Sequence, residues 1–431
     1  MPLRILAVLL LPAVAMAQIY TTNNDSELAV LIEEALERNP RVREAFFDYQ
    51  SVLRRIPQVT ALPDPVLAVT QHARTPETRV GPQTTIVSLS QKFPWFGKLS
   101  DQGKIVAKQA AVRDELYQAR RAEVVRQVKL AYYDIGYIDR ALAITHEEEE
   151  LLKHYETLAQ ARYSQGVGLQ QGVVKLQAEI TRVLNRRQEF ARQRVDAEAV
   201  LNLLRDRPAD GLVRGGKPGK RPIAAFDSAD LYRTGRENRP EVKAAFLQIE
   251  SQEKGIHLAQ RQRMPDFTLG ASWGNILGRR DEAGRLSPPA NNGKDVYSVT
   301  VGVNIPIFRS KYEAGIQEAT ERFSAAREGY RDAVNQVELS VRSIGFRLET
   351  IDEQIALFER ALLPQTEQAL RSVESAYATG SSGVLDLLDS ERTLLEARLG
   401  LARLETDYMK ALAEMERAIG SAFPEERHDE T

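Results

Sequence analysis

Two stretches of the chain, residues 267–273 and 297–305, alternate strictly between apolar and polar positions. A period of two places the apolar side chains of a strand on one face and the polar side chains on the other. A fainter alternation runs through residues 67–69 and 87–93. The pattern predicts antiparallel strand pairs, at about residues 65–73 with 84–93 and at about 266–274 with 295–305.

One face of these strands is expected to be apolar and to contact lipid. The opposite face carries Ser, Thr, Gly and Asn, which suits a wall lining water, and each stretch has about the ten residues that a tilted membrane strand needs. A half-buried sheet packed on helices is the alternative interpretation. The residues predicted to face the membrane are Leu67, Val87, Leu89, Leu269, Trp273, Val299, Val301 and Val303.

The number of strands bears on how many copies of the chain act together. No stretch after residue 17 is long and apolar enough for a transmembrane helix, and only helices and closed barrels satisfy the backbone in lipid. Eight strands leave an interior filled by side chains, whereas barrels of about 16 strands enclose an aqueous channel. A conduit built from four-stranded chains therefore favours three copies and about twelve strands.

Long helices are predicted to follow the strands, because apolar residues recur there at spacings of three and four. Val337, Val341 and Leu348 belong to such a coiled-coil seam. A helix from Lys98 to about Tyr163 would be on the order of 100 Å long at about 1.5 Å per residue. An element of that length must project beyond any barrel.

Glycines interrupt the helical runs and predict two helical hairpins per chain. The interruptions follow the Tyr-x-x-Gly segments at residues 163–166 and 377–380, and glycine is the usual punctuation between periodic segments. The predicted hairpin tips contain Gly166, Gly168, Gly380, Ser382 and Gly383.

The chain contains two copies of one unit. The Asn-Pro motif at Asn39 has a counterpart at Arg239-Pro240, and Tyr163 has a counterpart at Tyr377. Landmarks that recur in the same order indicate a duplicated architecture. We expect a first repeat at residues 18–205 and a second at 228–423, each with a helix, two strands and a long helical hairpin. A linker at 206–227, rich in Gly and Pro, separates them, and residues 424–431 form a tail.

The N-terminus has the features of a secretory signal peptide at residues 1–17. Arg4 precedes an apolar run over residues 5–14, and Ala15 and Ala17 frame a small-residue cleavage site. The sequence contains no cysteine, so disulfides do not stabilise the exported chain and a lipoprotein is not expected.

Composition and motifs exclude several functions. The chain has 27% charged and 43% hydrophobic residues and a formal net charge of -2, which is globular and does not indicate a nucleic-acid partner. No phosphate loop, metalloprotease motif or nucleophile elbow is present, so neither an enzyme nor a cofactor is predicted. His146, Glu150 and His154 could share a helix face and hold a metal, but a solvated charged face is the preferred interpretation and no metal site is predicted.

Taken together, the chain resembles the TolC family of outer-membrane efflux and secretion channels. The resemblance covers the mature chain and rests on the Asn39-Pro40 helix start, the strand start at residues 62–65, the strand-to-helix junction at residues 93–98 and both Tyr-x-x-Gly turns. The junction Phe-Pro-Trp-Phe-Gly-Lys is similar to that of members accompanying heavy-metal or cation efflux pumps, the CusC/CzcC-like branch.

The resemblance implies a mixed α and β fold with four transmembrane strands and long coiled-coil helices per chain. It also implies a homotrimer with a twelve-stranded β-barrel and a periplasmic α-helical barrel. Such a porin-like channel sits in the outer membrane with its helical part in the periplasm. It is docked through a periplasmic adaptor onto an inner-membrane pump of the RND or ABC type.

The resemblance further implies a pore gate at the periplasmic tip, formed by Tyr377, Asp386 and Asp389. Because the two aspartates lie three residues apart, they share a helix face, and in a trimer they would ring the axis and attract cations. Their mutual repulsion is expected to raise some of their pKa values. The chain departs from the family pattern at Ser382, where an arginine is common, and at Gly172 and Val173, which replace polar residues. These departures leave open whether the gate is closed by default.

The sequence thus predicts a passive exit duct of a tripartite efflux system, for small molecules or metal cations. A type I protein-secretion duct and a periplasmic coiled-coil scaffold without a pore are the alternatives. The identity of the cargo is expected to depend on the pump.

Overall fold

The computed structural model describes residues 26–216 and 227–423. The predicted signal peptide, residues 217–226 of the predicted linker and the predicted C-terminal tail lie outside these residues. The chain divides into two compact units, and each is described by itself. The first contains the described parts of residues 1–47, 115–243 and 332–431, and the second contains residues 48–114 and 244–331. Each unit therefore draws on both sequence repeats.

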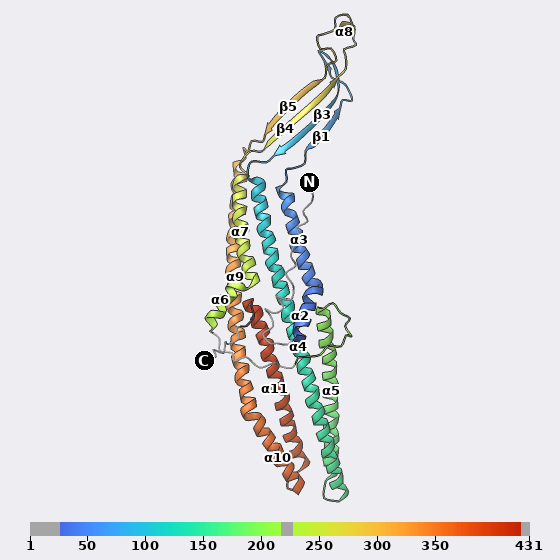
Figure 1. The fold of residues 1–431 in the computed structure, drawn as a ribbon, viewed down its shortest axis with the longest axis vertical. Helices are drawn as coiled ribbons and strands as arrows, with labels where there is room; N and C mark the ends of the chain where they lie inside the picture. Colours follow the sequence, from blue (N-terminus) through green and yellow to red (C-terminus); the bar gives the residue numbers. More distant parts are fainter. Residues whose placement is uncertain (1–25, 217–226, 424–431) are drawn as a thin grey trace. The chain divides into compact units, whose positions relative to one another are not determined.

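The second unit contains an antiparallel sheet with the strand order β1-β3-β4-β5 (Figure 1). Its strands are β1 (Val66–Gln71), β3 (Gly81–Phe93), β4 (Phe267–Ile276) and β5 (Val296–Val303), and the short β2 (Glu77–Thr78) pairs with β3. The pairing of β3 with β4 joins the two repeats in one sheet. A five-residue helix, α8 (Glu282–Leu286), lies in the connection between β4 and β5.

The register aligns the apolar residues of all four strands on one face of the sheet. Leu67 lies opposite Leu89, Leu89 opposite Ala271, and Ala271 opposite Val299. Side chains that are paired across neighbouring strands point to the same face, so the predicted face is continuous from β1 to β5.

This apolar face is exposed in the single chain. Leu67 is 67% exposed, Val299 is 77% exposed and Val301 is 69% exposed. The alternative of a sheet packed on helices is therefore wrong, because packing would have buried these side chains. Leu89, Leu269, Trp273 and Val303 are also exposed, and Val87 is half-buried.

Long helices adjoin the sheet, as the apolar seams predicted. Helix α4 (Lys98–Ser164) follows β3, and α9 (Arg309–Leu357) follows β5. Helix α3 (Pro40–Thr60) precedes β1, and α7 (Pro240–Arg261) precedes β4. At the junction of strand and helix, Asp266 accepts hydrogen bonds from the Lys98 Nζ and the Trp95 N–H, at 2.8 and 2.9 Å.

The first unit is helical. Its further elements are α2 (Ser26–Arg38), α5 (Gln170–Leu204), α6 (Ser228–Asn238), the π-helical turn η2 (Phe358–Leu362), α10 (Leu363–Thr379) and α11 (Val384–Ile419). Two hairpins result, α4 with α5 and α10 with α11 (Figure 1).

Apolar seams hold these helices together. Val337, Leu348 and Ile355 of α9 are fully buried, which confirms the predicted seam. A buried ion pair between Lys129 of α4 and Glu416 of α11 adds a polar contact inside this unit. Among the helices described, none is long and apolar enough to cross a membrane.

Candidate functional site

The turns of the two hairpins both depend on glycine. Gly166 follows the end of α4 with φ of 77°, and Gly380 caps α10 with φ of 83°. L-residues with a side chain avoid this left-handed region, whereas glycine adopts it freely. In the second turn the N–H groups of Gly380 and Ser381 donate to the carbonyls of Tyr377 and Ala376, so the last carbonyls of α10 are satisfied.

A groove of about 370 Å³ lies between the two tips. Four of the five predicted tip residues line it, all but Gly166. Two of the predicted gate residues, Tyr377 and Asp386, line it as well. The first hairpin contributes Arg162, Gly172 and Lys175 to the opposite wall. Residues predicted separately from two distant segments therefore line one site.

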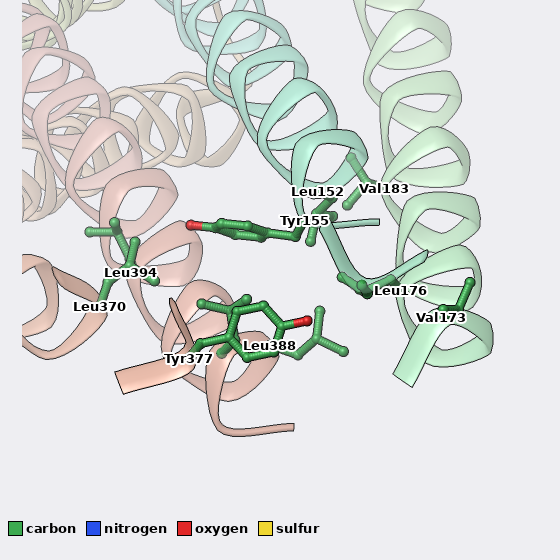
Figure 2. Close-up of a cluster of buried hydrophobic side chains, with 11 residues drawn as sticks. Leu152, Tyr155, Val173, Leu176, Val183, Leu370, Tyr377, Leu388 and Leu394 are labelled. Carbon is green, nitrogen blue, oxygen red and sulfur yellow. The ribbon is translucent and has the colours of Figure 1, made fainter. Parts of the chain in front are cut away.

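Tyr377 is buried between the hairpins, with only 8% of its surface exposed. Figure 2 shows its ring among aliphatic side chains of both hairpins, near Leu388 of α11 and below Tyr155 of α4. Burial of an aromatic ring at a helix contact stabilises that contact through its large apolar area. Tyr377 therefore belongs to the core that joins the two hairpins.

Arg162 of α4 holds Tyr377 in two ways. Its guanidinium lies over the Tyr377 ring, with the Cζ 4.9 Å from the ring centroid, and its Nη1 donates a hydrogen bond to the Tyr377 carbonyl. A cation over an aromatic ring is attracted by the negative face of the ring. Because that carbonyl lies in the last turn of α10, the guanidinium also meets the negative end of the helix dipole. Arg162 was not identified from the sequence, because it has no motif of its own beyond its position next to Tyr163.

A second link joins the hairpins further from the tip, seven residues before Arg162 on α4 and three residues before Tyr377 on α10. The hydroxyl of Tyr155 on α4 donates to a carboxylate oxygen of Glu374 on α10. Burial first, then the hydrogen bond to Glu374 and the negative charge of Glu374, raise the pKa of the Tyr155 hydroxyl, so it remains a donor.

Asp386 caps the start of α11. Its Oδ2 accepts from the Ser382 hydroxyl at 2.7 Å and from the Gly383 N–H at 3.1 Å. These hydrogen bonds, that of Ser382 first, lower the pKa of the Asp386 carboxyl in the single chain. The expected repulsion among aspartates would instead raise the pKa of Asp386. That repulsion requires the aspartates of neighbouring copies, whereas the hydrogen bonds that lower the pKa lie within one chain. Asp389 is exposed on the same helix, one turn onward.

The positions that depart from the family pattern have structural roles here. Ser382 orients Asp386, as described above. A Cβ on Gly172 would lie 2.9 Å from the Val384 Cγ2, so this glycine permits close approach of the second hairpin. Val173 is buried in the shared core.

Three exposed apolar side chains at the tips were not singled out from the sequence. Val167 is 69% exposed, Leu169 is 78% exposed and Leu385 is 55% exposed. Their apolar character next to turn glycines was the available signal, since turns are usually polar.

Metal ligation is not a feature of the described residues. No group of three or more His, Asp or Glu side chains that could hold an ion occurs among them. His146 lies 3.9 Å from Glu149 on the same helix.

The arrangement matches known transport proteins. The profile of the family described as "Outer membrane efflux protein" matches residues 31–204 and 231–421. The chain belongs to this family. The two matched segments lie within the two predicted repeats. Outer membrane efflux proteins are transport proteins and not enzymes. As a member of this family, the chain is an outer-membrane efflux channel of a tripartite system.

Individual relatives agree with this assignment. Nodulation protein T of Rhizobium leguminosarum bv. trifolii is 23% identical over 424 residues, covering 94% of this chain and 87% of that protein. Outer membrane protein OprJ of Pseudomonas aeruginosa is 24% identical over 435 residues, covering 94% and 86%. The solved structure of CusC superposes with a TM-score of 0.78 over 94% of each chain, at 17% identity. The predicted fold class is therefore confirmed, and a scaffold without a pore is wrong.

Proposed function

We propose that three copies of this outer membrane efflux protein form a continuous duct, passive in itself, for cargo expelled by an inner-membrane pump. The observation that carries the proposal is the exposed apolar face running across all four strands. Water would penalise such a face, whereas lipid favours it.

Closure of the duct requires other copies. Strands β1 and β5 lie at the edges of the four-stranded path, and each pairs with one neighbour along it. Unpaired edge groups are costly in lipid. Pairing of β5 of one copy with β1 of the next removes every edge when three chains, or about twelve strands, close into a barrel.

The helical unit also carries apolar residues that another copy can cover. Leu339 and Phe346 on α9 are 63% and 64% exposed, and Val195 and Leu203 on α5 are 62% and 69% exposed. The first pair is seven residues apart, the spacing of a coiled-coil seam. We assign both faces to contacts between copies.

The hairpin tips are proposed as the gate and the adaptor contact. Arg162 and the buried Tyr377 tie the two hairpins of one chain together, which keeps the tip narrow. Asp386 and Asp389 would then form the acidic constriction around the axis. The exposed Val167, Leu169 and Leu385 offer the apolar contact for a periplasmic adaptor, which connects the duct to an RND or ABC pump.

The acidic ring favours cations, in keeping with the cation-efflux resemblance at the 93–98 junction. A type I protein-secretion duct is the second candidate, since its fold is shared; co-purification of the adaptor and pump distinguishes them.

We also propose that the mature chain carries no thioether-linked lipid, because its sequence has no cysteine. An intact mass larger than that of the cleaved polypeptide would contradict this.

The duct is tested by extracting the mature protein from outer membranes in detergent. We expect a trimer that migrates differently after heating and that conducts ions in planar bilayers. A soluble monomer without ion current would overturn the proposal.

The gate is tested by Arg162→Ala. Loss of the cation–π contact, worth about 0.5–2 kcal/mol at a partly buried site, and of the hydrogen bond to the Tyr377 carbonyl should loosen the tip. We expect several-fold higher single-channel conductance. Arg371→Ala, which removes an exposed arginine of α10, is the matched control and should conduct like the parent. Equal conductance of all three proteins would rule out Arg162 as part of the gate.

A further inference from the structure

Aromatic rings lie at both ends of the apolar face of the sheet. At the junction with the helices, Phe93 pairs with Phe267, and the ring of Trp95 stacks on that of Phe267 with the centroids 5.7 Å apart. At the other end of the strands Trp273 pairs with Tyr297, and both side chains are exposed. Aromatic side chains are enriched where a membrane protein passes from lipid to water. The rings therefore mark the two limits of the proposed membrane band.

Polar side chains continue the same face beyond the pair of Trp273 and its neighbour on β5. Gln71 lies opposite Thr85 in the register, and the Thr85 hydroxyl donates to Gln71 Oε1 at 2.6 Å. Asp295 accepts hydrogen bonds from Trp273 Nε1 at 2.9 Å and from the Asn275 amide at 3.3 Å. Because side chains two residues apart on a strand share a face, the face changes from apolar to polar directly after Trp273. This change is expected at the level of the lipid head groups.

Basic side chains gather just beyond this level, in the connections at residues 72–80 and 277–295. Figure 1 shows α8, which lies in the second connection, at the end of the sheet opposite to the adjoining helices. The two connections touch, because the Gly293 N–H donates to the Val80 carbonyl at 2.8 Å. Five of their basic side chains are exposed and form no ion pair with another residue of the described parts of the chain: Arg74, Arg79, Arg280, Arg285 and Lys294.

The acidic residues of these connections leave a positive excess. The connections contain six basic and four acidic residues. Asp281 pairs with Arg279 at 2.7 Å and accepts from the Gly284 N–H at 3.1 Å at the start of α8. Asp295 is engaged by the end of β4, as described above. The five exposed basic side chains are therefore available to an anionic partner, and the planar guanidinium of arginine suits the oxygens of a phosphate.

We propose that these five side chains, the basic rim, bind the phosphate groups of glycolipid in the outer leaflet of the membrane. The proposal rests on the proposed duct, in which the helices occupy the periplasm and the opposite end of the sheet meets the outer leaflet. The lipid is favoured over a soluble anion because the rim adjoins the end of the apolar face. A lipid whose acyl chains cover that face carries its phosphates to the level of the rim.

The test counts bound lipid on the detergent-extracted protein by native mass spectrometry, with diphosphoryl lipid A as the probe. We expect the parent protein to bind lipid A and to bind the same glycolipid much more weakly once its phosphates are removed. Arg280→Gln with Arg285→Gln should weaken binding roughly thirtyfold, since each basic side chain near an anionic lipid surface contributes about fivefold. Arg280→Lys with Arg285→Lys keeps both charges and should retain most of the affinity.

Arg43→Gln with Arg371→Gln is the matched control. It removes two exposed arginines of α3 and α10, both of which lie in the other compact unit, and should bind lipid A like the parent. Equal binding of the dephosphorylated glycolipid, or parent-like binding by the Arg280→Gln, Arg285→Gln protein, would overturn the basic rim. Displacement of the lipid by an equal concentration of inorganic phosphate would also count against it.

The outcome is independent of the test of the duct. Lipid binding is read in detergent without ion current, so a protein that binds lipid A through the basic rim but does not conduct would contradict the duct alone. A conducting trimer that ignores the phosphates would contradict the basic rim alone.

Discussion

At the scale of single residues, the tip combines a local cap with a charge that can act at a distance. At the start of α11, Asp386 accepts hydrogen bonds from the Ser382 hydroxyl and the Gly383 N–H. Its lowered pKa keeps the carboxyl ionised to lower pH than that of an ordinary aspartate. The stabilisation from this cap is present above the ordinary pKa and is lost as the pH falls through the lowered one. The same carboxylate, together with Asp389, is proposed to attract cations to the pore.

The two roles of Asp386 can be separated by substitution. Asp386→Asn with Asp389→Asn should weaken block of the current by divalent cations several-fold, because the ring loses its negative charge. Ser382→Ala removes a hydrogen bond of the cap but keeps both charges, so block should persist. The measurement is a titration of single-channel current with a divalent salt. Unchanged block in the double variant would contradict the acidic ring.

At the scale of elements, glycines define where helices turn. Gly166 and Gly380 have positive φ, and both were predicted in turns from the sequence. The π-helical turn η2 was not foreseen. It ends two residues before Pro364, which has no N–H for the helical ladder, and the chain passes from α9 into α10 through this wider turn.

Alanine substitutions measure the cost of the left-handed turn. Gly380→Ala should destabilise the protein by about 1–2 kcal/mol, the cost of a side chain in this backbone region, and a Cβ would also press on Arg162 Nη2 at 3.0 Å. Gly329→Ala is the control. Gly329 lies within α9, where a Cβ would meet no atom within 4 Å outside its own helix backbone, so alanine there should stabilise by roughly 0.8–1 kcal/mol. Thermal unfolding of both variants gives the comparison, and a higher midpoint for Gly380→Ala would refute the interpretation.

At the scale of the whole molecule, the sheet is suited to lipid on one face only. Val299 lies on the apolar face and its neighbour Thr300 lies on the other. Each face continues across the paired strands, so the proposed insertion into the membrane would depend on the whole sheet and on closure with other copies.

An arginine on each face tests this assignment. Val299→Arg should cost about 2–4 kcal/mol at the bilayer midplane and reduce the amount of heat-modifiable assembly in the outer membrane. Thr300→Arg introduces the same residue one position along and should assemble normally while altering conductance. Equal assembly of the two variants would mean that the apolar face does not contact lipid.

The sequence by itself determined the repeats, the strands with one apolar face, the long helices and the glycine turns. These features arise from periodicity and local backbone preference, which depend on neighbours along the chain. Only the tertiary structure decided that β3 pairs with β4 and that Arg162 covers Tyr377. Those contacts join residues about 170 to 215 positions apart in the chain, and no periodic pattern records which distant side chains will be neighbours.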